Sequence, residues 1–230
     1  MACSQCAGAH EQYEVASTLE RLRYFPRQLL TADDMRVEQE YFREKQRRHN
    51  RFLHGWGVVC GLEVRQASTD AGTMKVSVCA GYALGPWGDE IYVEEPAPLD
   101  LTHCARPPGD PCLPSTVVAA VAVAPKLLVK IRYVECPSRP MRTLPAGCGC
   151  DETACEYSRT RDGFEVRCFV KPQILVLPPV VQVDAAVPAC IAPSPDPWVL
   201  LAEVESVAAG LDIKNTVRRV VRNTPSLAGM

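Results

Sequence analysis

The sequence lacks a hydrophobic run long enough to cross a membrane as a helix. Its longest apolar run, Val117 to Ala124 (VVAAVAVA), stops at Pro125, whereas a spanning helix needs about 20 apolar residues. The first ten residues, MACSQCAGAH, also lack the basic start and apolar centre of a secretory signal. We therefore expect no membrane-spanning segment and synthesis in the cytoplasm without a signal peptide.

The chain also lacks an excess of charge of either sign. Its 25 lysines and arginines nearly balance 27 aspartates and glutamates, which leaves a net charge of −2. A general nucleic-acid binder would be strongly basic, so this class of partner is not expected. The 230 residues are 47% hydrophobic and 23% charged, a usage that argues against wholesale disorder and fits one large or two small globular domains.

No sequence motif for catalysis is present. None of the four histidines stands near a serine or cysteine in a nucleophile motif such as G-x-S-x-G. The glycine-rich stretch Gly81 to Gly88 has no lysine and no helix after it to bind a phosphate, so we interpret it as a hairpin turn. We expect a protein that is not an enzyme and has no catalytic residue.

Proline, in contrast, is abundant. The chain has 20 prolines, about 9% where roughly 5% is usual, and proline interrupts helices and central strands alike. Short β-branched runs separated by Gly, Pro and Asp predict an antiparallel sheet. The runs are 58–64, 74–79, 90–93, 117–124, 127–134, 164–170, 173–176 and 198–204, with two small strands within 213–221.

One helix is expected, over Thr31 to Phe52. Thr31 and Asp34 form a capping-box-like start, and the segment contains neither glycine nor proline. Its acidic residues come early and its basic residues late, as the helix dipole favours. The apolar stripe is narrow, which suggests that the helix lies over another surface or pairs with a copy of itself.

These patterns predict a mainly β chain: an antiparallel β-sandwich or barrel-like domain with one N-terminal α-helix and a cysteine-rich loop. The expected divisions are a flexible leader (1–23), a helical segment (24–57), a β-rich domain (58–221) and a tail (222–230), with the cysteine-rich insertion at about 136–168.

Five of the 12 cysteines lie in this insertion, namely Cys136, Cys148, Cys150, Cys155 and Cys168. Tetrahedral zinc accepts four thiolates, which Cys148, Cys150 and Cys155 would supply together with either Cys136 or Cys168. One or two disulfides that staple the loop explain the cluster equally well. Both alternatives stay open, so zinc is the one cofactor that the sequence suggests; Cys104, Cys112 and Cys190 remain unassigned.

Several stretches carry a resemblance to known proteins. They are YFPRQLLTADD (24–34), HNR (49–51), LHGWGVVCGL (53–62), VSVCAGYAL (76–84), GDEIYV (88–93), LLAEV (200–204) and RRV (218–220). Together they resemble an uncharacterised group of phage-tail-like proteins of bacterial contractile injection systems. The segments 76–84 and 88–93 are similar to a β-hairpin of tail-fibre and baseplate modules.

The resemblance implies a structural subunit at the baseplate or fibre attachment of such a particle. Its expected partners are other subunits of the particle and copies of itself, as a homo-oligomer such as a trimer, and the released particle would carry it out of the cell. Arg and Trp dominate the energy of interfaces, so Arg43, Arg47, Arg48, Trp56 and Trp87 are the expected contact residues. The alternative function is a soluble zinc-binding interaction module that uses the Cys136–Cys168 loop.

Overall fold

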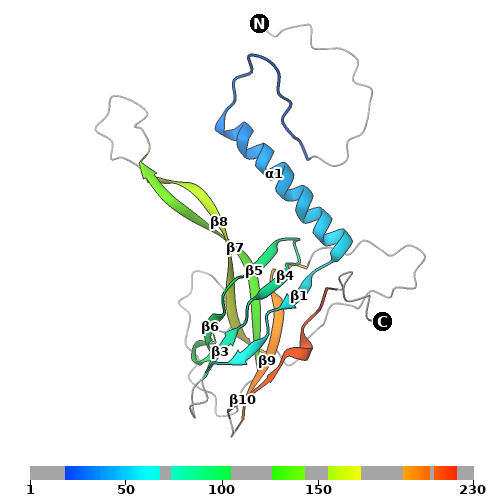
Figure 1. The fold of residues 1–230 in the computed structure, drawn as a ribbon, viewed down its shortest axis with the longest axis vertical. Helices are drawn as coiled ribbons and strands as arrows, with labels where there is room; N and C mark the ends of the chain where they lie inside the picture. The colour runs from blue at the N-terminus through cyan, green and yellow to red at the C-terminus, as the bar shows by residue number, and fades with distance from the viewer. Residues whose placement is uncertain are drawn as a thin grey trace, which may run out of the picture. The chain divides into compact units, whose positions relative to one another are not determined.

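A computed structural model describes residues 19–67, 74–104, 126–142, 155–171, 194–207 and 210–221. Within them the chain is mainly β and antiparallel, with one N-terminal helix, as the sequence predicts (Figure 1). The expected strands 117–124 and 173–176, the tail 222–230 and most of the leader lie outside the described residues. The chain divides into two compact units, 1–48 and 49–230.

The first unit contains α1 (Ala32–His49), whose start confirms the predicted capping box. The backbone N–H of Thr31 donates to the Asp34 carboxylate at 2.8 Å, and the Asp34 N–H donates to Thr31 Oγ1 at 3.2 Å. The hydrogen bonds from Thr31 hold the pKa of Asp34 below its usual value. The helix ends three residues before the predicted Phe52, because the chain continues as the π-helical turn η1 (Asn50–His54).

The second unit is a β domain with two short 3-10 turns, η2 (Leu101–His103) and η3 (Asn215–Val217). Its strands form three antiparallel sheets in the orders β1-β4-β5, β2-β3-β6 and β10-β9-β7-β8. Their bounds are β1 (Gly57–Gly61), β2 (Val64–Gln66), β3 (Lys75–Val78), β4 (Gly81–Leu84), β5 (Glu90–Val93), β6 (Ala97–Asp100), β7 (Leu127–Arg142), β8 (Cys155–Val170), β9 (Val199–Val207) and β10 (Gly210–Lys214).

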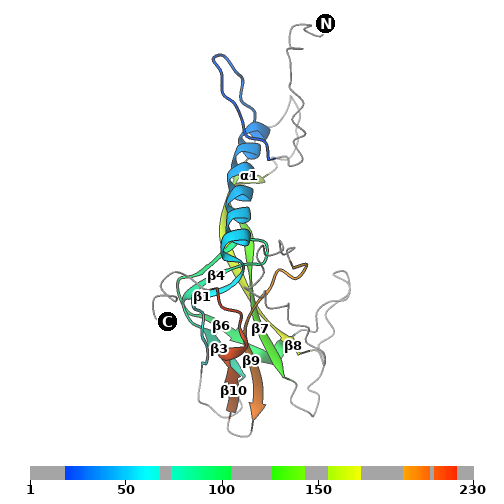
Figure 2. The same cartoon turned by 90° about the vertical axis from the view of Figure 1, so that its right-hand side faces the viewer.

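The core forms where the two small sheets meet the large one. Figure 2 shows β1 and β4 on one side of this domain and β8 on the other. Small and β-branched side chains from both sides fill the space between them, with alternate residues of each strand facing inward. The contributors include Val58, Val64, Val76, Val78, Ala83, Ile91 and Val93 from the small sheets, and Val129, Ile131, Val199, Leu201 and Val204 from the large one.

Two local differences from the sequence prediction have backbone causes. The run expected as one strand over 58–64 is split into β1 and β2, because Gly61 and Leu62 both have positive φ (61° and 55°). The stretch Gly81 to Gly88, expected to be a hairpin turn, begins with the strand β4; the turn itself is shorter and is closed by hydrogen bonds between Gly85 and Asp89 and between Gly88 and Gly85.

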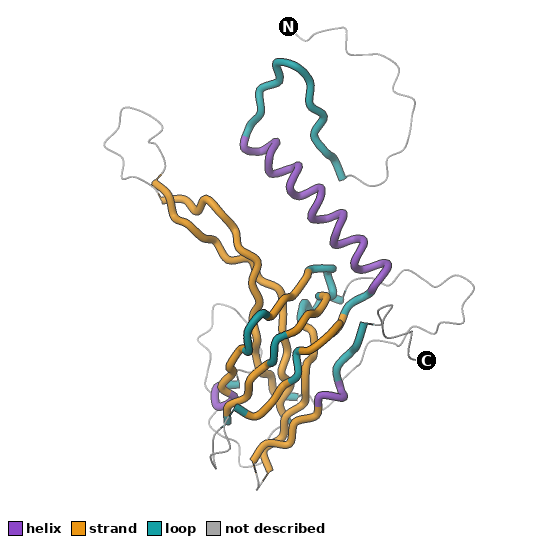
Figure 3. The backbone as a smooth tube through the Cα atoms, in the orientation of Figure 1, coloured by secondary structure: helices purple, strands orange, loops and turns teal. Residues whose placement is uncertain are grey.

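The largest difference is the length of the β7–β8 hairpin. Continuous pairing runs from Leu127 opposite Val170 to Arg142 opposite Cys155, so most of the segment expected as a cysteine-rich loop is strand. β9 pairs with β7 only as far as Ile131. Beyond that point the two strands continue as a ribbon, which Figure 3 shows extending past the other strands of the domain. We call residues 135–142 and 155–162 the arm.

Candidate interaction surfaces

Two motifs that are far apart in the sequence of the β domain, HGWGVVCG (54–61) and RRV (218–220), lie in contact in the structure. The Trp56 ring lies under the guanidinium of Arg219, with Cζ 4.5 Å from the ring centroid. The Val58 N–H donates to the Arg219 carbonyl at 2.8 Å, and the Val221 N–H donates back to the Val58 carbonyl at 2.8 Å. Arg218 Nη1 adds a hydrogen bond to the Gly61 carbonyl at 3.0 Å. Residues 218–221 thus hold the HGWGVVCG motif (54–61) through side-chain and backbone contacts. We call this set of contacts the clamp.

The glycine at position 57 is required by this clamp. Gly57 has a φ of +135°, which side chains rarely permit, and a Cβ there would lie 2.6 Å from the Arg219 carbonyl oxygen. The close approach also buries part of the Arg219 side chain, and this desolvation lowers the pKa of its guanidinium. Trp56 is half-buried and packs against the core cluster. Its indole therefore contributes to the fold, whatever else it contacts.

Trp87 occupies a more open position than Trp56. It lies in the β4–β5 turn with 46% of its surface exposed, and its Nε1 donates to the Ser194 carbonyl at 2.9 Å. The neighbouring Gly88 carbonyl accepts a 2.9 Å hydrogen bond from the Nδ2 of buried Asn50. The Trp87 ring is thus partly open to solvent while its Nε1 is hydrogen-bonded.

The three arginines predicted as contacts lie on the last turns of α1. Arg47 pairs with Glu44 at 2.6 Å and Arg43 with Glu40 at 3.4 Å, each one turn apart. Arg43 and Arg48 are exposed and Arg47 is partly buried. Such surface pairs contribute little to stability, so these residues keep their role as predicted interface residues.

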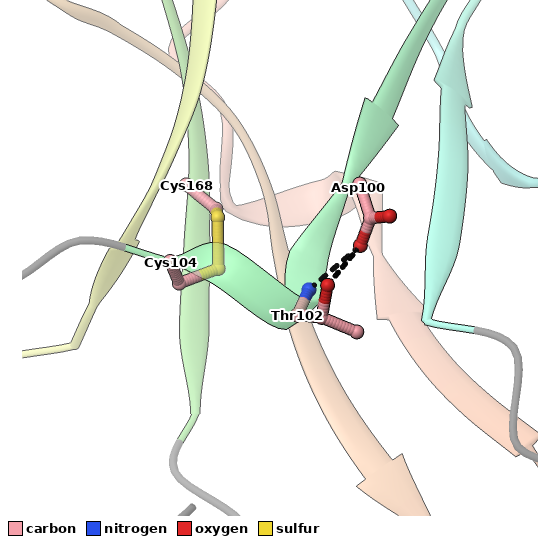
Figure 4. The surroundings of a disulfide bond; sticks show 4 residues. All are labelled: Asp100, Thr102, Cys104 and Cys168. Carbon is pink, nitrogen blue, oxygen red and sulfur yellow. Dashed lines mark hydrogen bonds between the residues drawn. A yellow bond between two sulfur atoms is a disulfide. The ribbon is translucent and has the colours of Figure 1, made fainter. Parts of the chain in front are cut away.

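The three cysteines of the insertion that the structure describes, Cys136, Cys155 and Cys168, do not converge. Cys168 is bonded to Cys104, which connects β8 to the end of η2 across 64 residues of sequence (Figure 4). The Cys168 side chain belongs to the core and is only 6% exposed. The nearby η2 turn is held by Asp100, which accepts hydrogen bonds from the N–H and hydroxyl of Thr102. Sequence spacing did not reveal this pairing, because Cys104 lies far outside the cluster.

The zinc set expected from the sequence cannot be completed. Cys136 opposes Arg161 and Cys155 opposes Arg142, so the two free, exposed thiols lie six strand positions apart, or about 20 Å at the rise of a β-strand. Cys168, the other expected fourth ligand, is in the disulfide. Cys148 and Cys150 lie outside the described residues, and no group of His, Cys, Asp or Glu in the described part could hold a metal. Cys168 is in a disulfide, but its partner Cys104 lies outside the cluster, so this bond is not one of the loop-stapling pairs that the sequence suggested.

The arm is the feature that the sequence prediction missed. All eight β8 residues from Cys155 to Asp162 are exposed, and Met141 and Tyr157 each show 60% of their surface. Pro137 and Pro140 lie within β7 itself. They are tolerated there because β9 no longer pairs with β7 at these positions, so no ladder hydrogen bond is lost on that side.

The base of the arm is well anchored, in contrast to its exposed end. Tyr133 donates to the Asp162 carboxylate at 2.6 Å, and burial together with this hydrogen bond raises the pKa of Tyr133. On the other face, Arg132 pairs with Glu165 at 2.6 Å and lies 4.8 Å from the Trp198 ring centroid. The hairpin is therefore rigid where it leaves the domain.

Comparisons with known proteins give a distant structural similarity. No family model matches the chain, and no curated protein matches it. One similar solved chain comes from a structure titled "Crystal structure of TssK": it is 12% identical, with a TM-score of 0.43, over 86% of this chain and 41% of that one. The chain thus spans about two-fifths of that protein's length. At this level of similarity we draw no conclusion about function from it. No helix among the described residues is long and apolar enough to cross a membrane.

Proposed function

We propose that the chain is a non-enzymatic structural subunit of a phage-tail-like contractile injection particle, at the baseplate or fibre attachment. The observation that carries the proposal is the arm: a two-stranded ribbon, exposed at nearly all of its described positions, on a domain whose described residues form a hydrophobic core of their own. An isolated two-stranded hairpin is marginally stable in water. A neighbouring subunit that covers the arm would supply the packing that stabilises the hairpin.

The composition of the arm supports a protein partner. Met, Tyr and Arg are enriched in interface cores, and the arm presents Met141, Tyr157, Arg139 and Arg159 on an exposed ribbon. The motifs that carry the resemblance to tail-like proteins all lie outside the arm: in the N-terminal unit (24–34), around Trp56 (49–62), in β3 to β5 (76–93), in β9 (200–204) and at 218–220. Most of the shared motifs thus build the β domain, and the arm is the part that would distinguish one subunit from another.

The test compares two exposed tyrosines in one assembly experiment. Tyr157→Asp alters the arm, and Tyr92→Asp is the matched control, because Tyr92 is also in a strand and is 64% exposed on the domain body. Each variant replaces the native chain in the producing cells, and sheathed particles are collected through a density cushion. We expect Tyr157→Asp to be depleted from the particles at least several-fold while Tyr92→Asp is retained.

The arm assignment is wrong if both variants enter the particles at the native copy number. A circular dichroism melt of each purified variant shows whether a loss of incorporation reflects unfolding. Equal melting temperatures with unequal incorporation support the proposal.

A further inference from the structure

The helix α1 carries one uninterrupted uncharged seam. Starting at Ala32, its members are spaced alternately three and four residues apart: Ala32, Met35, Gln39, Phe42, Gln46 and His49. Every other residue of the helix is charged except Val37 and Tyr41. The alternation of three and four is the heptad spacing of a coiled-coil seam.

This seam is exposed in the single chain. All six residues are exposed, including Met35 at 44% and Phe42 at 59% of their surface, and α1 has no buried residue. In proteins most of the stability of a helix comes from packing one of its faces against another element. Its residues of intermediate exposure lie off the seam, among them Asp34, Tyr41 and Glu44.

We infer that α1 packs along this seam against α1 of other copies of the same chain, in parallel and in register. The proposal extends the proposed function, in which the chain assembles with copies of itself, by assigning the surface and the direction of packing. The seam is self-complementary, because two copies that pack along it bring only uncharged residues together.

The charges beside the seam select the parallel arrangement. With Met35 and Phe42 at d positions, Glu38 is a g position and Arg43 is the e position of the next heptad. In a parallel coiled coil, g of one helix faces this e position of its neighbour, so Glu38 meets Arg43 of the other copy. An antiparallel pair places e beside e and g beside g, so the repulsion of Arg36 and Arg43 offsets the attraction of Glu38 and Lys45, whereas the parallel pair gains Glu38 with Arg43 without an opposing like-charge pair.

The contacts within one chain leave this pairing feasible. Glu38 accepts a hydrogen bond from the Tyr24 hydroxyl through one carboxylate oxygen, and Arg43 is 3.4 Å from Glu40 through one guanidinium nitrogen. A guanidinium has five N–H donors and a carboxylate has two acceptor oxygens, so each group can take part in more than one contact. The seam covers about two and a half heptads, so it adds to other contacts between subunits instead of holding the copies alone.

The first experiment is oxidative cross-linking of the full chain. Gln39→Cys places a thiol on the seam, and Val37→Cys is the matched control, exposed on the same helix but off the seam. After identical mild oxidation, mass spectrometry quantifies the peptide in which position 39 or 37 is joined to itself, so native cysteines do not interfere. We expect at least a tenfold excess of the 39–39 peptide, and equal yields overturn the proposal.

A charge exchange tests the contact between Glu38 and Arg43 of neighbouring copies. Glu38→Arg is expected to raise the dissociation constant of the oligomer about threefold or more, and adding Arg43→Glu is expected to restore it. A double variant weaker than the single one contradicts the parallel arrangement. If the chain enters particles but no 39–39 peptide forms, this inference fails and the proposed function stands; a monomer absent from particles removes both.

Discussion

The guanidinium of Arg219 lies 4.5 Å above the ring centroid of Trp56, and its own carbonyl accepts the N–H of Val58 at 2.8 Å. Arg219 thus contacts the start of β1 with both its side chain and its backbone. The contact joins the start of β1 to residues 219–221, which follow η3 in the second unit.

Removing the Trp56 ring should destabilise the whole domain. Trp56→Ala deletes a half-buried indole that packs on the core and under Arg219, and we expect a loss of about 2 kcal/mol in the free energy of unfolding. Urea titration followed by circular dichroism measures it. Trp87→Ala is the control, with an expected loss below about 1 kcal/mol because that ring is exposed; equal losses would contradict this role of Trp56.

Gly57 should not accept even a methyl group. Gly57→Ala places a Cβ 2.6 Å from the Arg219 carbonyl oxygen at a positive φ, which we expect to cost more than about 1 kcal/mol. Gly85→Ala serves for comparison, because its Cβ would be 3.5 Å from its nearest neighbour, the Asp89 carbonyl oxygen. If thermal melts show the same midpoint for both variants, the clamp does not exclude a side chain at position 57.

Reduction of the Cys104–Cys168 disulfide should weaken the domain. The bond closes a loop across 64 residues of sequence, and the chain-entropy relation gives about 4 kcal/mol for a loop of that size. We expect Cys104→Ser to lower the free energy of unfolding by a similar amount and to abolish the further effect of reductant. Cys60→Ser, at a free and exposed thiol, should retain the native response to reductant. A native protein that melts identically with and without reductant would contradict the prediction.

Acid should release an ion pair at Glu203. This carboxylate is 6% exposed and accepts a 2.6 Å hydrogen bond from Lys171 Nζ, which holds the pKa of Glu203 below its ordinary value of 4.5. Because the folded pKa of Glu203 is lower than the unfolded one, the stabilisation is fully present above the ordinary value and is lost as the pH falls from there through the lower folded pKa.

The corresponding test is a series of urea titrations between about pH 6 and pH 3. Glu203→Gln should show a smaller loss of stability over that range and a loss of about 2 kcal/mol at neutral pH. Glu205→Gln is the control, since Glu205 is more exposed and lies 3.3 Å from Lys126 Nζ. An acid dependence for Glu203→Gln equal to that of the native chain would exclude Glu203 as its source.

Local patterns predicted the elements that depend on local physics. The strand at 90–93 has the expected bounds, and Thr31 with Asp34 caps the helix as expected. The arm was missed because Pro137 and Pro140 normally end a strand, and only the absence of β9 at that level permits them. The bond between Cys104 and Cys168 and the contact between Trp56 and Arg219 were also missed, because each depends on how distant strands pair.

The position of the native chain in the producing cell tests the central claim most directly. A gentle lysate is sedimented through a density cushion, and the pellet is analysed by electron microscopy and quantitative mass spectrometry. The proposed function predicts that this chain pellets with tubular sheathed particles at a fixed, low copy number per particle. Recovery only in the supernatant, as a small species absent from sheathed particles, would contradict it.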